Sequence, residues 1–506
     1  MKRSILAFVL FVSFILLAVP AINIYFAPSR EAIKMEKSFL FNVDFVSRWT
    51  AALLYPLGIS TDPKKVIVGK DDWLYLGDGY QTTVSDDRRV ATEADRVLGR
   101  QIGAATKAWD SYLKAHGVQV FSIMIGPNKS SIYPENMPSW ARPISHNPVD
   151  ALLQEAGSDI FIDLRPPLLK AKKTLNEDLY FKTDTHWNAL GAGIAFRHFA
   201  EQVGKADPNI RWPSEKFYDL IGNAKRKGGD LANFLRLSSS FSDPEPRMFS
   251  GVLPVQTSQV DYLTGVILRT GGNPGVGAPS KPLLVRSEGA LNKKKVLWLR
   301  DSFGDALSPL MASTFSDVLH LHWNRAIKPG GNFAQLVEEF KPDYVFVTVV
   351  ERAARSAEFS YYPPTVLLAM NGDFKIASDT EVVSINHLKP SADGADFNVV
   401  GNDAYFDVSL NKPISAVDGQ YLGLDLICAD GSLSVPLQLY WIDESGTSYS
   451  QANSVSLQLP VGATLIDLRT VYKWPAGVVI KRLRVDLEQT KFCSRIKFKS
   501  PKFLTK

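Results

Sequence analysis

Residues 180–191 read YFKTDTHWNALG, which places Asp184 two residues before His186 at the entrance of a predicted helix. Asn188 can cap that helix, because its side-chain oxygen can accept a backbone N–H of the first turn. The apolar residues that follow recur at the spacing of a buried helical stripe: Leu190, Ile194, Ala195, Phe199 and Val203. We therefore expect Asp184 and His186 on a loop before a helix. A carboxylate there can fix the imidazole tautomer and stabilise its protonated form, as a general base requires.

The candidate nucleophile is Ser302, in the stretch KVLWLRDSFGDAL of residues 295–307. Val296–Leu299 is typical of a short buried strand, and Phe303 onward predicts a turn into a helix. A serine at that junction presents its hydroxyl at the carboxyl end of the strand, and its own N–H and the helix N-terminus can face an oxyanion. Taken singly, such a serine is more often a cap and a lone histidine a core residue. Together, the two segments supply a nucleophile, a base and a group that orients the base.

Further motifs lie in the same part of the chain: VIVGKDDWLYL at 66–76, GPNKSSIYP at 126–134 and GDL at 229–231. With these motifs the chain resembles, from about Val66 to Arg352, the AlgX/AlgJ-like polysaccharide O-acetyltransferases. The domain of that family is a circularly permuted relative of the SGNH (GDSL-type) hydrolases, in which the serine motif ordinarily comes first and the histidine motif last. The resemblance implies that Ser302 is the nucleophile, His186 the base and Asp184 its orienting partner.

The α/β pattern of residues 60–360 predicts an SGNH-like domain built on a parallel sheet. A hairpin is expected over 66–76 and a helix over 92–116, ended by Gly117. Residues 208–292 predict loops with short strands, inserted near the site. The buried strands of the expected sheet are residues 118–125, 159–164, 296–299, 318–323 and 343–350.

Ordinary SGNH hydrolases offer a glycine and an asparagine to the oxyanion, and neither is plainly present here. Arg325 and Arg352 follow predicted strands, so either guanidinium can hold the oxyanion or the acyl group. The alternative is that Glu351 pairs with Arg352 at the rim of the sheet. The remaining candidates for substrate binding, which are equally compatible with a framework role, are Lys129, Tyr133 and Trp187.

Residues 373–506 have the alternating pattern of a β-sandwich, most simply a jelly roll. This pattern resembles the carbohydrate-binding modules of polysaccharide-modifying enzymes. The aromatic residues that can stack on sugars, or alternatively belong to the core, are Trp441, Tyr449, Tyr472 and Trp474. Cys428 and Cys493 are the only cysteines, and in an exported domain the pair suggests a disulfide, with two buried thiols as the alternative.

Residues 1–30 predict a membrane anchor. Lys2 and Arg3 precede an apolar run from Ile5 to about Phe26, long enough to span a bilayer with the N-terminus in the cytoplasm. A cleaved signal peptide is the competing interpretation. Either places the remaining chain in the periplasm, and we expect it to be anchored to the inner membrane. A second apolar patch, Phe45–Ile59, predicts a surface or core helix.

The net charge of +5 permits an acidic polysaccharide or anionic lipid as a partner. The basic residues lack the aromatic interleaving of a nucleic-acid platform, so no nucleic-acid partner is expected. No residues have metal-ligand spacing and no glycine-rich phosphate loop is present, so we expect no metal or cofactor.

The resulting hypothesis is an O-acetyltransferase that acts on an exported polysaccharide through a serine acyl-enzyme. The alternatives are an acetylesterase or deacetylase, and a polysaccharide-binding assembly protein without catalysis. The resemblance implies that a membrane-bound O-acyltransferase delivers the acetyl group; an activated acetyl ester is the other donor considered.

Overall fold

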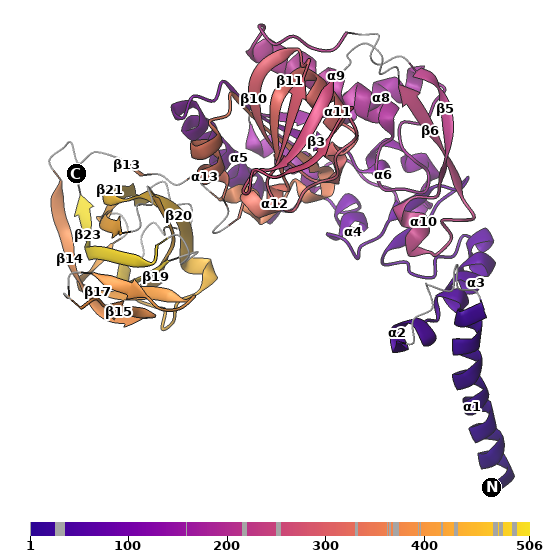
Figure 1. Cartoon of the computed structure of the whole chain (residues 1–506), viewed down its shortest axis with the longest axis horizontal. Coiled ribbons are helices and arrows are strands. Elements are labelled where there is room, and N and C mark those ends of the chain that lie inside the picture. The colour runs from indigo at the N-terminus through magenta and orange to yellow at the C-terminus, as the bar shows by residue number, and fades with distance from the viewer. Residues whose placement is uncertain are drawn as a thin grey trace.

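The computed structural model describes residues 2–25, 36–157, 159–214, 220–248, 255–328, 332–361, 363, 366–367, 374–392, 394, 396–415, 418–429, 434–468, 474, 479–487 and 493–505. An N-terminal helix, an α/β unit and a C-terminal β unit follow one another along the chain (Figure 1). The helix is α1 (Lys2–Tyr25), whose segment Ile5–Tyr25 is long and apolar enough to cross a membrane.

The α/β unit is organised on an eight-stranded sheet. Its strands, in spatial order, are β4 (Phe161–Asp163), β3 (Val120–Gly126), β12 (Tyr344–Val350), β10 (Asn292–Arg300), β11 (Phe315–Leu321), β9 (Leu283–Glu288), β7 (Gln256–Asp261) and β8 (Ile267–Thr270). The pairings among the first five strands are parallel, and those that add β9, β7 and β8 are antiparallel. The prediction of buried strands is confirmed for β3 and β12, which are buried at every position, whereas the predicted strand 159–164 is the half-buried edge strand β4.

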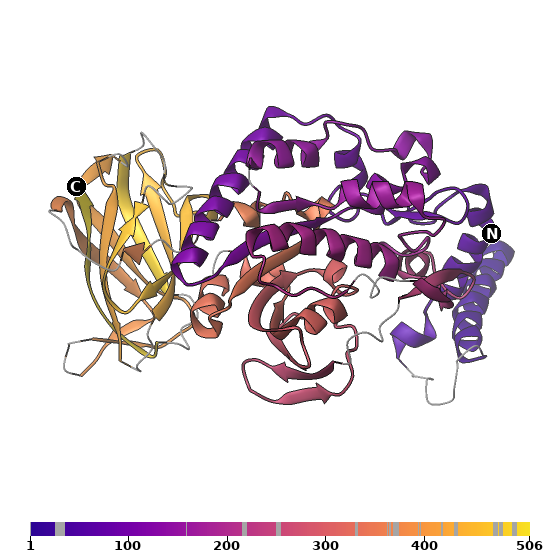
Figure 2. The same cartoon turned by 90° about the horizontal axis from the view of Figure 1, so that it is seen from above.

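Helices and hairpins surround this sheet (Figure 2). The predicted helix over 92–116 is confirmed as α5 (Glu93–Ala115), which begins with a capping box between Thr92 and Asp95. The hairpin over 66–76 is confirmed as β1 (Val66–Val68) and β2 (Leu74–Leu76). The other elements are α4 (Thr83–Asp87), α6 (Lys129–Ile132), α7 (Pro148–Ala156), α8 (Arg165–Thr174), α9 (Ala189–Ala206), β5 (Leu220–Lys227), α10 (Asp230–Phe234), β6 (Ser242–Met248), α11 (Ser308–Thr314), α12 (Trp323–Ala326) and α13 (Phe333–Phe340).

Aromatic side chains pack the main helices against one another and onto the sheet. Phe199 of α9 meets Phe346 of β12 edge to face, with ring centroids 4.9 Å apart. Trp109 of α5 stacks on Phe333 of α13 at 4.2 Å. All four side chains are buried in one continuous core, which holds the strand ends that carry the polar site in fixed positions.

The C-terminal unit is built from antiparallel strands around a separate apolar core. The main path is β13 (Val366–Leu367), β21 (Gly462–Asp467), β18 (Tyr421–Cys428), β23 (Arg495–Thr505), β14 (Lys375–Asn386), β17 (Ala404–Ser415), β22 (Val479–Leu487), β19 (Ser434–Asp443) and β20 (Ser454–Pro460), with β15 (Leu388–Pro390) and β16 (Phe397–Val399) beside it. Because β13 pairs with β21, the sheet takes in residues before 373, the expected start of this domain.

Cys428 and Cys493 form a disulfide, with Cα atoms 5.5 Å apart and a sequence separation of 65 residues. Cys428 ends β18, and Cys493 lies just before β23, which pairs with β18. The bond therefore closes a long loop across two neighbouring strands.

We expect reduction of this disulfide to destabilise the C-terminal unit by about 4 kcal/mol, because the closed loop restricts the unfolded chain. Calorimetry of the full chain with and without a phosphine reductant measures the change. The variant Cys428→Ala/Cys493→Ala is the control, since the reductant should leave its transitions unchanged. Equal unfolding temperatures for the oxidised and reduced wild type would contradict the expectation.

Candidate active site

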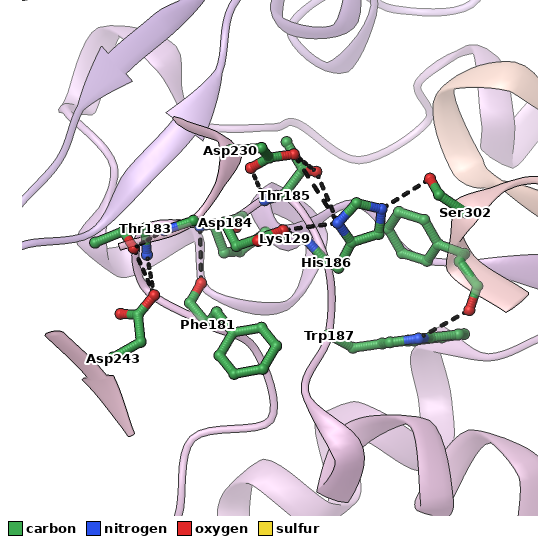
Figure 3. A network of polar contacts seen from close by, with 12 residues as sticks. Lys129, Phe181, Thr183, Asp184, Thr185, His186, Trp187, Asp230, Asp243 and Ser302 are labelled. Carbon is green, nitrogen blue, oxygen red and sulfur yellow. Dashed lines mark hydrogen bonds and ion pairs between the residues drawn. The ribbon is translucent and has the colours of Figure 1, made fainter. Parts of the chain in front are cut away.

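Asp184, His186 and Ser302 form a continuous hydrogen-bonded chain (Figure 3). The Asp184 Oδ1 to His186 Nδ1 distance is 2.7 Å, and the His186 Nε2 to Ser302 Oγ distance is 2.8 Å. A carboxylate opposite Nδ1 favours the tautomer with the proton on that nitrogen, which leaves Nε2 to accept the Ser302 hydroxyl proton. The geometry is that of a serine placed to lose its proton to a histidine.

The loop before α9 carries Asp184 and His186, and Lys129 binds the backbone of this loop. The Lys129 ammonium donates to the carbonyl oxygens of Phe181, Lys182 and Asp184 at 3.0, 2.8 and 2.7 Å. Burial lowers the pKa of Lys129 to about 7. These three bonds favour the framework role for Lys129, since its ammonium is engaged by the histidine loop. Asn188 caps α9 as predicted, because its side chain accepts the Gly191 N–H at 3.0 Å.

Two other proposed ligands are also framework residues. The buried Tyr133 hydroxyl accepts the Leu179 N–H at 2.9 Å. The buried Trp187 indole donates to the Phe303 carbonyl at 3.1 Å and so ties the histidine loop to the serine turn. Both side chains join segments of the framework. Their aromatic character alone could not tell this framework role from substrate binding.

Ser302 lies at the end of β10, in a single 3₁₀ turn (Ser302–Gly304). Asp301 fixes this turn, since its carboxylate accepts the Phe303 N–H at 2.9 Å and the Val350 N–H of β12 at 2.7 Å. The next helix, α11, begins only at Ser308. The predicted turn into a helix is therefore confirmed, with the 3₁₀ turn and residues 305–307 standing between Ser302 and α11.

Charges around His186 favour its protonated form. Burial by itself disfavours the imidazolium, but the hydrogen bond and negative charge of Asp184 outweigh it, with a further contribution from Asp230, so the pKa of His186 is raised. Burial likewise opposes ionisation of Asp184. Its hydrogen bond to His186 and the nearby Arg226, whose Nη2 lies 2.7 Å from Oδ2, still hold its pKa well below the usual range.

Asp230 is a site residue whose role the sequence did not predict, although it lies in the quoted motif at 229–231. It accepts the Thr185 N–H and hydroxyl at 2.8 and 2.6 Å, and its Oδ2 lies 3.9 Å from His186 Nδ1. Gly229 allows this approach, because a Cβ there would overlap the Asp184 side chain. The donor atoms of Asp184, His186 and Asp230 lie within metal-binding distance of one another, but internal hydrogen bonds already engage them.

The two arginine candidates differ in position. The Arg352 guanidinium lies 5.9 Å from the Phe303 ring centre and donates to Asn128 Oδ1 at 3.2 Å. The Arg325 side chain is exposed on α12, and in the part of the chain described it has no hydrogen bond or ion pair with the triad. The alternative pairing of Glu351 with Arg352 is wrong, since Glu351 accepts the Asn128 N–H at 2.7 Å and lies beside Arg165.

Asn128 is a second residue that the sequence analysis missed. Its side chain is buried, and its Nδ2 is among the few buried polar atoms of the described residues without a hydrogen-bond partner. Arg352 engages Oδ1, so the amide nitrogen is the free end. An unpaired buried donor is costly to a folded protein. Asn128 also lines a small cavity together with Arg352 and with Thr185, the neighbour of His186.

The two tryptophans of the expected sugar platform belong to the core of the C-terminal unit. Trp441 is fully buried in the core, and Trp474 packs edge to face against it at 5.2 Å. The half-buried Tyr449 donates its hydroxyl to Asp407, and Tyr472 lies outside the described residues. Trp441 lies on β19 and points into the core, and Trp474, which lies outside the strands, packs onto it.

Part of the chain is similar in sequence to proteins of the AlgX/AlgJ type. Residues 66–264, less than half of the chain, match the family described as "SGNH hydrolase-like domain, acetyltransferase AlgX". The probable alginate O-acetylase AlgJ of Pseudomonas putida is 28% identical over 187 residues, which cover 36% of this chain and 44% of that protein. Its counterpart in Pseudomonas aeruginosa is 28% identical over 204 residues, covering 39% and 47%. The chain thus matches less than half the length of these curated relatives.

Among solved structures, Bacillus cereus PatB1 is 17% identical, with 58% of this chain and 98% of that chain covered and a TM-score of 0.43. The resemblance to AlgX/AlgJ-like proteins that the motifs indicated is confirmed. The family match includes Asp184, His186 and Asp230 and ends before Ser302. The pairing of Ser302 with the histidine loop is therefore a result of the three-dimensional structure.

We expect Asp230→Asn to lower the pKa of His186, because the substitution removes a nearby negative charge that stabilises the imidazolium. A base must be neutral to accept a proton, so activity falls as pH drops through this pKa. The acid limb of the pH–rate profile should accordingly move to lower pH. Proton NMR of the His186 ring measures the same shift directly. Asp261→Asn, on the distant β7–β8 hairpin, is the matched control, and an identical limb in both variants would contradict the assignment.

Proposed function

Because residues 66–264 match the AlgX acetyltransferase domain, we propose that this chain is an O-acetyltransferase acting on an exported polysaccharide. The observation that carries the proposal is the Asp184–His186–Ser302 hydrogen-bonded chain. The alginate O-acetylase AlgJ relatives indicate the substrate class, and a chain with net charge +5 suits an acidic polymer. The location proposed is the periplasmic face of the inner membrane, with α1 as the anchor.

The chemistry proposed is a two-step acyl transfer. Ser302 Oγ attacks the carbonyl carbon of an acetyl donor while His186 Nε2 takes the hydroxyl proton. The tetrahedral intermediate then collapses, the bond to the leaving group breaks, and His186 returns the proton to that group. A sugar hydroxyl next attacks acetyl-Ser302 and gives its proton to His186, which passes it back to Ser302 Oγ as the ester bond breaks. No metal or cofactor takes part in this scheme.

Arg352 and Asn128 are the donors we propose for the acetyl carbonyl. Arg352 lies beside the serine turn, and its hydrogen bond to Asn128 Oδ1 leaves Asn128 Nδ2 as an unpaired buried donor. Preorganised donors of this kind stabilise the oxyanion, because they need no reorganisation during the reaction. They take the place of the glycine and asparagine expected in ordinary SGNH hydrolases.

The order of the motifs supports a permuted SGNH domain, since His186 precedes Ser302 in the chain.

We also interpret the C-terminal unit as a jelly roll that contacts the polysaccharide. The half-buried cluster of Tyr405, Tyr449 and Arg484 is the better candidate surface, because Arg484 lies 3.7 Å over the Tyr405 ring and 5.8 Å from the Tyr449 ring centre. A membrane-bound acyltransferase is the proposed acetyl donor, and an activated ester is its laboratory substitute.

We expect wild-type protein incubated with an activated acetyl ester to gain about 42 Da, the mass of an acetyl group replacing a proton on Ser302. Intact-mass spectrometry detects this adduct, and Ser302→Ala should not form it. Addition of a sugar oligomer should move the acetyl group to the oligomer. Release of acetate without capture would instead favour the esterase, and absence of both adduct and turnover in folded protein would favour a binding protein without catalysis.

We expect Arg352→Gln to lower kcat on the order of 10²–10³, the usual cost of losing one oxyanion donor. Arg325→Gln is the matched control, because it removes the same charge from an exposed position without triad contacts, and its kcat should stay near that of the wild type. Turnover of a chromogenic acetyl ester measures both variants. Equal losses in the two would contradict a specific role for Arg352.

A further inference from the structure

The helix that follows the N-terminal anchor exposes an apolar face. It comprises α3 (Asp44–Leu54) and the 3₁₀ turn Tyr55–Leu57. Trp49, Leu53 and Leu57 are 76%, 73% and 69% exposed, and Val46 is exposed on the same side. Their spacing of three or four residues puts all four on one face of a helix. We call these four residues the outer face of α3.

The opposite side of α3 is fixed to the α/β unit. Ala51 is buried in a cluster that includes Leu231 and Leu235 of the α10 region. Tyr55 packs edge to face on Phe241 with ring centroids 5.0 Å apart. Two hydrogen bonds add to this packing. Arg48 donates to the Ser239 hydroxyl, and Arg236 donates to the Asp44 carboxylate. The outer face therefore remains exposed because α3 is already docked, and rotation of the helix to bury it would break these contacts.

The end of α1 lies against the start of α3. Asn23, in the last turn of α1, donates its side-chain N–H groups to the carbonyls of Leu40 and Asn42 at 2.9 and 2.8 Å. Asn42 is two residues before α3. The segment long enough to cross a membrane ends at Tyr25, so these contacts place α3 at the level where that segment leaves the apolar layer (Figure 1).

We propose that α3 lies on the outer surface of the membrane, with its outer face inserted among the lipid headgroups and upper acyl chains. This inference rests on the proposed anchor α1. A bilayer is the occupant that fits, because the face is apolar, carries a tryptophan as interfacial helices do, and adjoins the chain's own membrane segment. The β7–β8 hairpin also exposes leucines, but it forms one edge of the eight-stranded sheet, whereas α3 follows the segment that Asn23 of α1 binds.

The consequence is a fixed orientation of the active site relative to the membrane. The cluster that receives Ala51 includes Leu231, and α10 begins one residue earlier at Asp230. Asp230 binds Thr185, next to His186. A membrane contact at α3 is thus linked through one short helix to the histidine loop, whereas α1 alone would leave the domain free to tilt.

Site-directed spin labelling tests this in full-length protein reconstituted in vesicles of phosphatidylethanolamine and phosphatidylglycerol. The only two cysteines are joined in a disulfide, so an introduced cysteine is the sole free thiol. Labels replace Leu53 and Leu57 in turn. Leu10→Cys in α1 reports insertion of the anchor, and Leu263→Cys, 68% exposed on the β7–β8 hairpin, is the matched aqueous control. Accessibility to oxygen and to a water-soluble nickel chelate is measured at each position.

We expect positions 53 and 57 to lose access to the nickel chelate and gain access to oxygen relative to position 263. Water-like values at 53 and 57 would overturn the inference, and the result at position 10 shows whether the anchor fails with it. Loss of access to both reagents would also overturn it, because a protein partner would then cover the face. Adduct formation on Ser302 is independent of all these outcomes, so failure here is distinguishable from failure of the proposed chemistry.

Discussion

The buried ammonium of Lys129 is the interaction on which the site depends. Its three N–H donors are matched by three carbonyl oxygens of the histidine loop, so the protein itself solvates this buried charge. Burial of a cation without such partners would cost several kcal/mol. The carbonyls of Phe181, Lys182 and Asp184 converge on one atom, which forces the loop into a single tight curve. That curve places Asp184 Oδ1 at 2.7 Å from His186 Nδ1.

The serine turn is fixed by its own set of contacts. Hydrogen bonds of His186 and Trp187 join it to the histidine loop. Asp301 bonds the backbone of its own turn and of β12, so the sheet determines where Ser302 lies. Trp187 then connects the loop to this turn through the Phe303 carbonyl. Residues more than a hundred positions apart in the chain are thereby held within hydrogen-bond distance, because each is anchored to rigid elements before they meet.

Sequence patterns predicted the parts of the site that local chemistry defines. The spacing of Asp184 and His186, the cap at Asn188 and the strand before Ser302 depend on near neighbours and were all readable. Arg226, Asp230 and Asn128 were missed because their roles arise from contacts across the fold, and an isolated aspartate or asparagine carries no periodic signal. Trp441 belongs to the core, and the sequence did not decide this because an aromatic residue in a strand has the same sequence pattern whether it faces a sugar or a core.

The charges around His186 suit a base that must gain and lose a proton repeatedly within one turnover. Arg226 keeps Asp184 ionised, so the carboxylate remains an acceptor when the imidazole is neutral. Asp230 adds negative charge beside Nδ1 and stabilises the imidazolium that forms when Ser302 or a sugar hydroxyl is deprotonated. Arg352 opposes that charge from the side of the serine turn. The pKa of His186 is therefore set by acids on one side and a cation on the other. Arg226 and Asp230 therefore influence both the proton affinity of the imidazole and, through their bonds to Asp184 and Thr185, the position of the loop that carries it.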